Sequence, residues 1–225
     1  MSTTTRTYGD PCGVARSLDV IGDRWALLVV RELLLGPKRF SDLIEGLTGA
    51  SPNVVSQRLR DLVDHGVVRR HDLGPPTRVH LYELTDWGRE LEPAVLHLGR
   101  WGSRAPGALP DRSLGVDSLV LGLKTAFAAD RAGDRKATYE LHIDDHVFTL
   151  RIAGGRLDAR HGHPDTPPDA VITTGRRALT DAVQGHRSLD DLLDTGDLTV
   201  TGSRSAATLA RSALLSPATD ADRVV

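Results

Sequence analysis

The clearest helix signal in this chain lies in residues 51–66, SPNVVSQRLRDLVDHG. Ser51 is a favourable N-cap, because its hydroxyl can accept a hydrogen bond from a backbone N–H of the first turn. Pro52 suits the first helical position, and Gly66 is the residue type that ends helices in a left-handed conformation. Apolar residues recur between these signals at helical spacing, at Val55, Leu59 and Leu62. The stretch therefore predicts one amphipathic helix with a buried stripe.

The opposite face of this helix has the residue types that read DNA. Amide and guanidinium groups form paired hydrogen bonds with base edges, and a reading helix presents them along its first turns. The outer face carries Asn53, Gln57, Arg60 and Asp64. We therefore expect this helix to lie in the major groove of double-stranded DNA.

The flanking segments predict a winged helix-turn-helix. Residues 40–47 form a short amphipathic helix, and residues 48–50 make the turn into the next one. Residues 67–71 and 79–84 have strand patterns, and the Gly- and Pro-containing segment 72–77 is typical of a hairpin tip. The alternative is an ordinary α+β subdomain with solvated arginines. The agreement of caps, turn and hairpin in order and spacing favours the winged helix.

The residues expected to contact DNA lie before the short helix, on the reading helix and on the wing. They are Lys38, Arg39, Ser51, Pro52, Asn53, Ser56, Gln57, Arg58, Arg60, Arg70 and Arg78. The chain has a net charge of −2, and residues 1–105 hold 14 Lys/Arg against 13 Asp/Glu, so the positive charge is local. We expect modest non-specific affinity, with specificity supplied by base contacts and dimerisation.

Three more helices are expected in the first half of the chain. Residues 12–21 place Val14, Leu18 and Ile21 on one face, and residues 24–35, capped by Gly22 and Asp23, are apolar nearly all round. A third helix at 85–101 has a broad apolar stripe made of Trp87, Leu91, Val95, Leu98 and Trp101. Packing within the domain would explain this stripe. We favour a dimer contact shared with the first helix, because a palindromic operator needs a twofold protein.

The second half of the chain has a different pattern. A Gly- and Pro-containing segment begins at Gly102, so we place a first domain at 1–105, a linker at 106–113 and a second domain at 114–225. A helix near 114–127, strands at 138–143 and 146–152, and further alternating strands and helices predict a small α+β domain. The sheet should be mostly antiparallel, with helices on one side. The fold class of the whole chain is α+β.

The first half resembles the HxlR-type winged-helix regulators, relatives of the MarR-like group. The resemblance covers residues 12–101 and rests on the motifs LDVIGDRW at 18–25, RELLLGPKRFSDL at 31–43 and YELT at 82–85. It implies a homodimeric bacterial transcription factor, with the hairpin at 71–79 as its wing. The family often has Pro after its N-terminal Cys and Gly-Lys before the Trp, where this chain has Gly13 and Asp23-Arg24. Neither departure touches the reading helix.

Residues 114–215 look like a sterol-carrier-protein-type lipid-binding domain. The resemblance rests on the hairpin and on the motifs DAVITTG at 169–175, VQG at 183–185 and LTVTG at 198–202. It implies a helix layer over a sheet that can enclose an apolar tunnel, and hence a sensor for an apolar small molecule. The expected ligand-binding residues are Leu119, Leu123, Phe127, Tyr139, Leu141, Phe148 and Leu150. The alternative is a filled core with no ligand, serving as a dimerisation module.

Catalytic and metal motifs are missing from the sequence. It has no P-loop, nucleophile elbow or dinucleotide fingerprint, so we expect no enzyme activity and no cofactor. The histidine pairs at 142/146 and 161/163 would have to converge to bind zinc, and solvated histidines explain them as well, so we expect no metal. Cys12 is the single cysteine. It is a redox candidate whose thiolate Arg16 could favour, or else a buried structural residue.

These patterns predict a bacterial transcriptional regulator, a repressor that binds a palindromic operator as a homodimer and responds to an apolar effector. No apolar run approaches the ~20 residues of a membrane span and no signal segment is apparent, so we expect a cytoplasmic protein without membrane partners. Two alternatives remain open. One is a lipid- or polyketide-handling protein whose N-terminal domain serves dimerisation. The other is a thiol-based redox sensor that uses Cys12.

Overall fold

The computed structural model describes residues 7–72, 74, 79–106 and 114–214. The chain divides into two compact units, Met1–Val95 and Leu96–Val225. Of the predicted linker, only Pro106 is among the described residues, and the predicted hairpin tip lies largely outside them. None of the described helices is long and apolar enough to cross a membrane.

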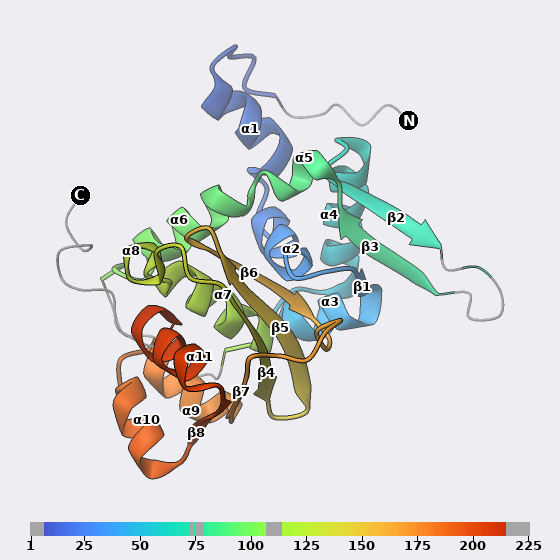
Figure 1. Cartoon of the computed structure of the whole chain (residues 1–225). Helices are drawn as coiled ribbons and strands as arrows, with labels where there is room; N and C mark the ends of the chain where they lie inside the picture. The colour runs from blue at the N-terminus through green and yellow to red at the C-terminus, as the bar shows by residue number, and fades with distance from the viewer. Residues whose placement is uncertain (1–6, 73, 75–78, 107–113, 215–225) are drawn as a thin grey trace. The chain divides into compact units, whose positions relative to one another are not determined.

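The first unit contains mostly helices and one small sheet (Figure 1). Its elements are α1 (Gly13–Ile21), α2 (Ala26–Leu33), β1 (Lys38–Arg39), α3 (Phe40–Gly46), α4 (Pro52–Asp64), β2 (Val68–Asp72), β3 (His80–Leu84) and α5 (Asp86–Arg89), and α6 (Glu92–Gly102) begins in it. The strands are antiparallel in the order β1-β3-β2, with Tyr82 between Lys38 and Arg70. The helix-turn-helix is α3 and α4, and β2 and β3 are the wing. The predicted α+β class is confirmed.

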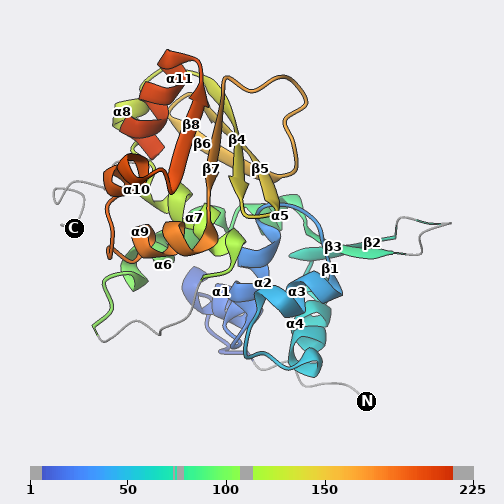
Figure 2. The same ribbon diagram turned by 90° about the horizontal axis from the view of Figure 1, so that it is seen from below.

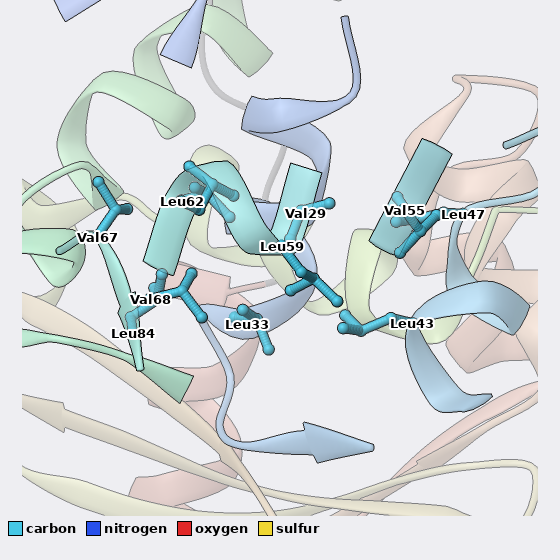
Figure 3. Packing of buried hydrophobic residues seen from close by; sticks show 11 residues of the cluster. Val29, Leu33, Leu43, Leu47, Val55, Leu59, Leu62, Val67, Val68 and Leu84 are labelled. Carbon is cyan, nitrogen blue, oxygen red and sulfur yellow. The ribbon is translucent and has the colours of Figure 1, made fainter. Parts of the chain in front are cut away.

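Apolar side chains from α2, α3 and α4 meet the base of the wing in the core of this unit (Figure 3). Val55, Leu59 and Leu62 of α4 are buried there, as their spacing predicted. The other buried members of the cluster are Val29, Val30, Leu33, Leu43, Leu47, Val67, Val68 and Leu84. This packing fixes which face of α4 remains outside.

Two predicted helices differ from the structure. The helix predicted at 24–35 begins at Ala26, because Trp25 has a φ of 80° and neither Gly22 nor Asp23 caps it. The single helix predicted at 85–101 is two helices, α5 and α6. Pro93 explains the break, since a proline inside a continuous helix would remove a backbone hydrogen bond and clash with the preceding turn.

The second unit is a five-stranded mixed sheet with helices on one side (Figure 2). The strand order is β6-β5-β4-β7-β8, with β4 and β7 parallel and the other pairs antiparallel. The elements of this unit are α7 (Val116–Ala126), α8 (Ala129–Ala132), β4 (Ala137–Ile143), β5 (His146–Ala153), β6 (Arg156–His161), β7 (Ala170–Thr174), α9 (Arg176–Val183), α10 (Leu189–Thr195), β8 (Leu198–Gly202), α11 (Arg204–Leu209) and a π-helical turn (Ala210–Leu214).

The side chains expected to bind an apolar ligand form the core of this second unit. Six of the seven are almost completely buried, at most 5% exposed, and Phe127, which follows α7, is half-buried. The six are Leu119, Leu123, Tyr139, Leu141, Phe148 and Leu150. Tyr139 also donates a hydrogen bond from its hydroxyl to the Ala206 carbonyl at 3.0 Å. The alternating residues therefore pack against the helices, as their pattern predicted, but here they fill the space between the layers.

Candidate nucleic-acid interface

Helix α4 begins and ends where its sequence signals predicted. The Ser51 hydroxyl accepts a hydrogen bond from the Val54 N–H at 3.4 Å, and Pro52 occupies the first turn. The helix ends at Asp64, and Gly66 has a φ of 73°, which is unfavourable for any residue with a side chain. The helix N-terminus is exposed, and its positive end is a favourable place for a phosphate group.

The outer face of α4 presents three polar side chains at the spacing of one or two turns. Asn53, Gln57 and Arg60 are exposed, as are Ser51 and Pro52 at the start of the helix, whereas Ser56 is half-buried. The opposite side is held in the core, so this face is the one that can enter a groove. Its amide and guanidinium groups can donate to and accept from base edges.

Hydrogen bonds orient the side chain of Gln57. Its Nε2 donates to Asp61 Oδ1 at 2.7 Å, and its Oε1 accepts from Arg60 Nη2 at 2.7 Å. The amide therefore has a defined direction before any DNA is bound. One Nε2 hydrogen and one lone pair of Oε1 remain, which is the pair of groups that an adenine edge requires.

Arg58 is placed differently from the other expected DNA contacts. Its guanidinium makes ion pairs with Asp23 and with Asp61, the latter at 3.3 Å, and its side chain is 18% exposed. Asp23 lies just after α1 in the sequence. Arg58 therefore joins α4 to the segment between α1 and α2, and its charge is neutralised within the fold.

Lys38 and Arg39 are neighbours with different surroundings. Lys38 Nζ donates to Glu32 Oε2 at 2.8 Å, and only 11% of its side chain is exposed. Glu32 is buried and also accepts a hydrogen bond from Arg31 at 2.7 Å. The positive charge of Lys38 is therefore neutralised by Glu32 inside the domain. Arg39 is exposed. Of this pair, Arg39 is therefore the one whose charge is exposed.

At the wing, Arg70 belongs to a polar cluster. Its Nε lies 3.3 Å from Asp72 Oδ1, and its Nη2 lies 2.8 Å from His80 Nε2. The hydrogen bond from His80 is the main reason why the pKa of Asp72 is lowered. Arg70 is about half exposed, so its guanidinium can still reach a phosphate. Arg78, the other wing residue expected to contact DNA, lies outside the described residues.

Comparison with known proteins identifies the first unit. Residues 20–108 match the family described as HxlR-like helix-turn-helix. An uncharacterized HTH-type transcriptional regulator of Bacillus subtilis, YvaP, is 38% identical over 89 residues, which is 39% of this chain and 82% of that protein. Another in Synechocystis, sll1512, is 37% identical over 97 residues, 42% of this chain and 70% of that one. The chain belongs to the HxlR-like helix-turn-helix family. The predicted resemblance is confirmed for this half.

Two solved structures are similar to the same half of this HxlR-like chain. The redox regulator HypR in its oxidized form is 32% identical, covers 43% of this chain and 100% of its own, and has a TM-score of 0.40. PA1607, a putative transcription factor, is 39% identical to this chain and has a TM-score of 0.42. The match covers 48% of this chain and 73% of PA1607.

The second unit of this HxlR-like chain matches a different family from the one expected. Residues 114–220 match the family described as alkyl sulfatase C-terminal. The sterol-carrier resemblance is corrected accordingly, because the motifs that carried it are short and loose. The description comes from an enzyme, but it shows no activity for this chain.

Apolar side chains are exposed on α1 and on the helices that follow the wing. On α1, Val14 is 68% exposed and Leu18 is 42% exposed, and no residue of that helix is buried. Trp87 is 53%, Leu98 49% and Trp101 69% exposed, whereas Leu91 and Val95 pack against the core of the first unit. The stripe predicted on 85–101 is thus divided into a packed part and an exposed part.

Cys12 is exposed at the N-terminus of α1. The nearby backbone N–H groups of Ala15 and Val14, at the start of α1, lower the pKa of its thiol. The alternative of a buried structural cysteine is therefore wrong. Arg16 is not needed to explain the lowered pKa, because the helix start itself supplies the donors.

The four histidines considered as metal ligands have carboxylate partners or are exposed. His142 Nε2 and His163 Nδ1 contact the two oxygens of Glu140 at 2.7 and 3.0 Å, and His161 Nε2 lies 3.1 Å from Asp117 Oδ2. His146 is exposed. Within the described part of the chain, no three His, Cys, Asp or Glu side chains are arranged to hold a metal ion.

Proposed function

We propose that this protein is a transcriptional regulator that binds a palindromic operator as a homodimer. The observation that carries the proposal is the outer face of α4, where Asn53, Gln57 and Arg60 are exposed above a buried stripe. Membership of the HxlR-like family supports it, because the curated relatives are named as HTH-type transcriptional regulators. DNA reading by α4 would use the amides for base edges and Arg39 and Arg70 for phosphates.

The proposed dimer follows from the exposed apolar side chains. Leu98 and Trp101 lie about one turn apart on α6 and are both exposed, and exposed apolar side chains that gather in this way mark an interaction surface. A homodimer would place two copies of α4 in successive major grooves, with half-sites about 34 Å apart or a multiple of that distance. Leu98→Glu would then yield monomers in sedimentation and weaken operator binding, because a charge in an apolar interface is costly.

In vitro selection from random duplex DNA tests the operator proposal. The selected sequence should be an inverted repeat, and Gln57→Ala should bind it more weakly. Gln184→Ala, a matched loss of an amide on the C-terminal side of α9, should bind as the unaltered protein does. Selection of an unpaired half-site, or of no sequence at all, would contradict the proposal. Transcription in vitro from a promoter overlapping the operator should fall as protein is added, and a rise would exclude a repressor.

We also propose that the second domain binds a small apolar effector that lowers operator affinity. Its support is a layer of helices on an apolar sheet face. Because Leu119, Tyr139 and Phe148 are buried, the ligand would have to move α7 away from the sheet. It must also favour the DNA-free arrangement, since equal affinity for both arrangements changes nothing. Saturable binding of 1-anilinonaphthalene-8-sulfonate, with release of operator DNA, is the expected result. Binding without release would exclude sensing by this route.

A second candidate function is thiol sensing by Cys12. The specific observation is that the thiol is exposed and that two backbone N–H groups lower its pKa, which increases the thiolate fraction near neutral pH. Treatment with hydrogen peroxide should then lower operator affinity in the unaltered protein and leave Cys12→Ser unchanged. An equal loss in both proteins would place the sensitivity elsewhere, for example in Met1 or the tryptophans.

A further inference from the structure

The second unit has a concave site on the sheet face that its helices do not cover. Residues alternate along β4 and β5, so Thr138, Thr149 and Arg151 point away from the buried Tyr139 and Leu150. The cavity has a volume of about 500 Å³, within the range of small-molecule sites. The side chains that line it include Thr138, Thr149, Arg151, Asp158, Arg160 and Asp165. None of the side chains expected to bind an apolar ligand belongs to it.

The wall of this site is the irregular segment 162–169, which is held at both ends. At one end the Thr149 hydroxyl donates to the Gly162 carbonyl at 2.9 Å. At the other end the Thr138 N–H donates to Asp169 Oδ2 at 2.8 Å, and the Asp169 N–H returns a hydrogen bond to the Thr138 carbonyl at 2.8 Å. The wall is thus tied to the two strands that form the floor, and the site exists before a ligand binds.

Ion pairs neutralise one of the two arginines in the site. Arg160 Nη2 lies 2.6 Å from Asp165 Oδ2, so this pair closes the wall onto β6. Arg151 and Asp158 are opposite each other in the β5–β6 register, yet no ion pair joins them to each other or to another group in the described residues. The floor therefore offers one guanidinium and one carboxylate on adjacent strands, about 5 Å apart in backbone spacing, without partners.

We propose that this site binds a small polar molecule that carries both a carboxylate and an amino group. The planar Arg151 guanidinium suits a carboxylate, with two parallel hydrogen bonds. Asp158 accepts from the amino group, and the hydroxyls of Thr138 and Thr166 supply further hydrogen bonds. The inference does not depend on DNA binding or on an apolar effector, because it concerns the opposite face of the sheet.

The test is an NMR titration of the full-length protein with two matched probes. β-Alanine carries both groups, and propionate carries the carboxylate alone. We expect saturable shifts at Thr138, Thr149 and Arg151 with both probes, and a dissociation constant about five-fold lower for β-alanine. Arg151→Gln should abolish binding of both probes. Asp158→Asn should lower the affinity for β-alanine to the affinity for propionate.

Arg156→Gln is the matched control, because Arg156 is exposed on the same strand and face as Asp158 but does not line the cavity. It should bind both probes as the unaltered protein does. An absence of saturable shifts, equal affinity for the two probes, or equal weakening by Arg156→Gln and Arg151→Gln would overturn the proposal. Backbone spectra of the free variants show whether each is folded.

Discussion

Gln57 Nε2 and Asp61 Oδ1 lie 2.7 Å apart on the exposed side of α4, one helical turn from each other. Asp61 is also paired with Arg58, which in turn contacts Asp23 at the end of the α1 segment. The amide that is best placed to read a base is thus oriented by a chain of contacts that begins outside the reading helix. An oriented amide loses less conformational freedom when it binds, so its preference for one base edge is sharper.

Asp61→Asn should therefore lower base discrimination at the position that Gln57 contacts. Gln57→Ala should lower it by about 1–3 kcal/mol, the worth of a bidentate contact, and Asp61→Asn by part of that. In the Gln57→Ala background, Asp61→Asn should have no further effect on discrimination. Fluorescence anisotropy with the operator and its single-base variants measures all four proteins. Additive losses would show that Asp61 acts independently of Gln57.

Substitution of Arg39 should affect DNA binding, whereas substitution of Lys38 should affect the stability of the fold. Arg39→Gln should weaken binding to all sequences alike and reduce the slope of log K against log salt by about 0.9, the value of one phosphate contact. Lys38→Gln should leave that slope unchanged and destabilise the fold by roughly 3 kcal/mol, since buried Glu32 loses a partner and keeps only Arg31. Salt titrations and urea unfolding separate the two. A reduced slope for Lys38→Gln would show that Lys38 leaves Glu32 for DNA.

Gly88→Ala should destabilise the first domain. A Cβ at this position of α5 would collide with the backbone carbonyl oxygen of Val67, which already accepts hydrogen bonds from the N–H and hydroxyl of Thr85. The Val67 carbonyl cannot move away without weakening its hydrogen bonds to Thr85. We therefore expect the free energy of unfolding, measured in urea, to fall by about 1–3 kcal/mol. Gly102→Ala, where a Cβ would meet nothing within 4 Å, should change stability by no more than about 0.5 kcal/mol.

Tyr139→Phe should cost about 1 kcal/mol, because the hydroxyl donates to the Ala206 carbonyl inside the core. Burial raises the pKa of Tyr139 to about 12, chiefly by desolvation. The neutral phenol is therefore favoured in the folded state. The stabilisation that the neutral phenol gives the folded state is complete below the unfolded pKa of about 10. It is lost as the pH rises from there towards 12. The difference between the two proteins in urea unfolding should shrink between pH 9 and pH 11, and a constant difference would contradict this assignment.

The helix at the centre of the first domain was predictable from the sequence because its signals act locally. Ser51, Pro52 and Gly66 influence only the residues within a turn of them, and the stripe of Val55, Leu59 and Leu62 depends only on helical spacing. The break between α5 and α6 is an equally local effect of Pro93. The rule that a proline interrupts a continuous helix would have located it from the sequence. The two-residue strand β1 has no local signal in the sequence, because it forms only by pairing with Tyr82 in a distant segment of the chain.

Tertiary structure decided which charges are available to DNA and where a ligand could enter. Arg58 and Asp23 are 35 residues apart, and Lys38 meets Glu32 only because a buried carboxylate in α2 faces β1. No pattern within either segment distinguishes such a paired cation from the exposed Arg39. In the second domain, alternation predicts which residues face the helices, and only the packing of the two layers determines that the helix-covered face is filled. The reason is physical: hydrogen-bonded caps and periodicity are properties of neighbouring residues, whereas ion pairing and close packing depend on distances that exist only after folding.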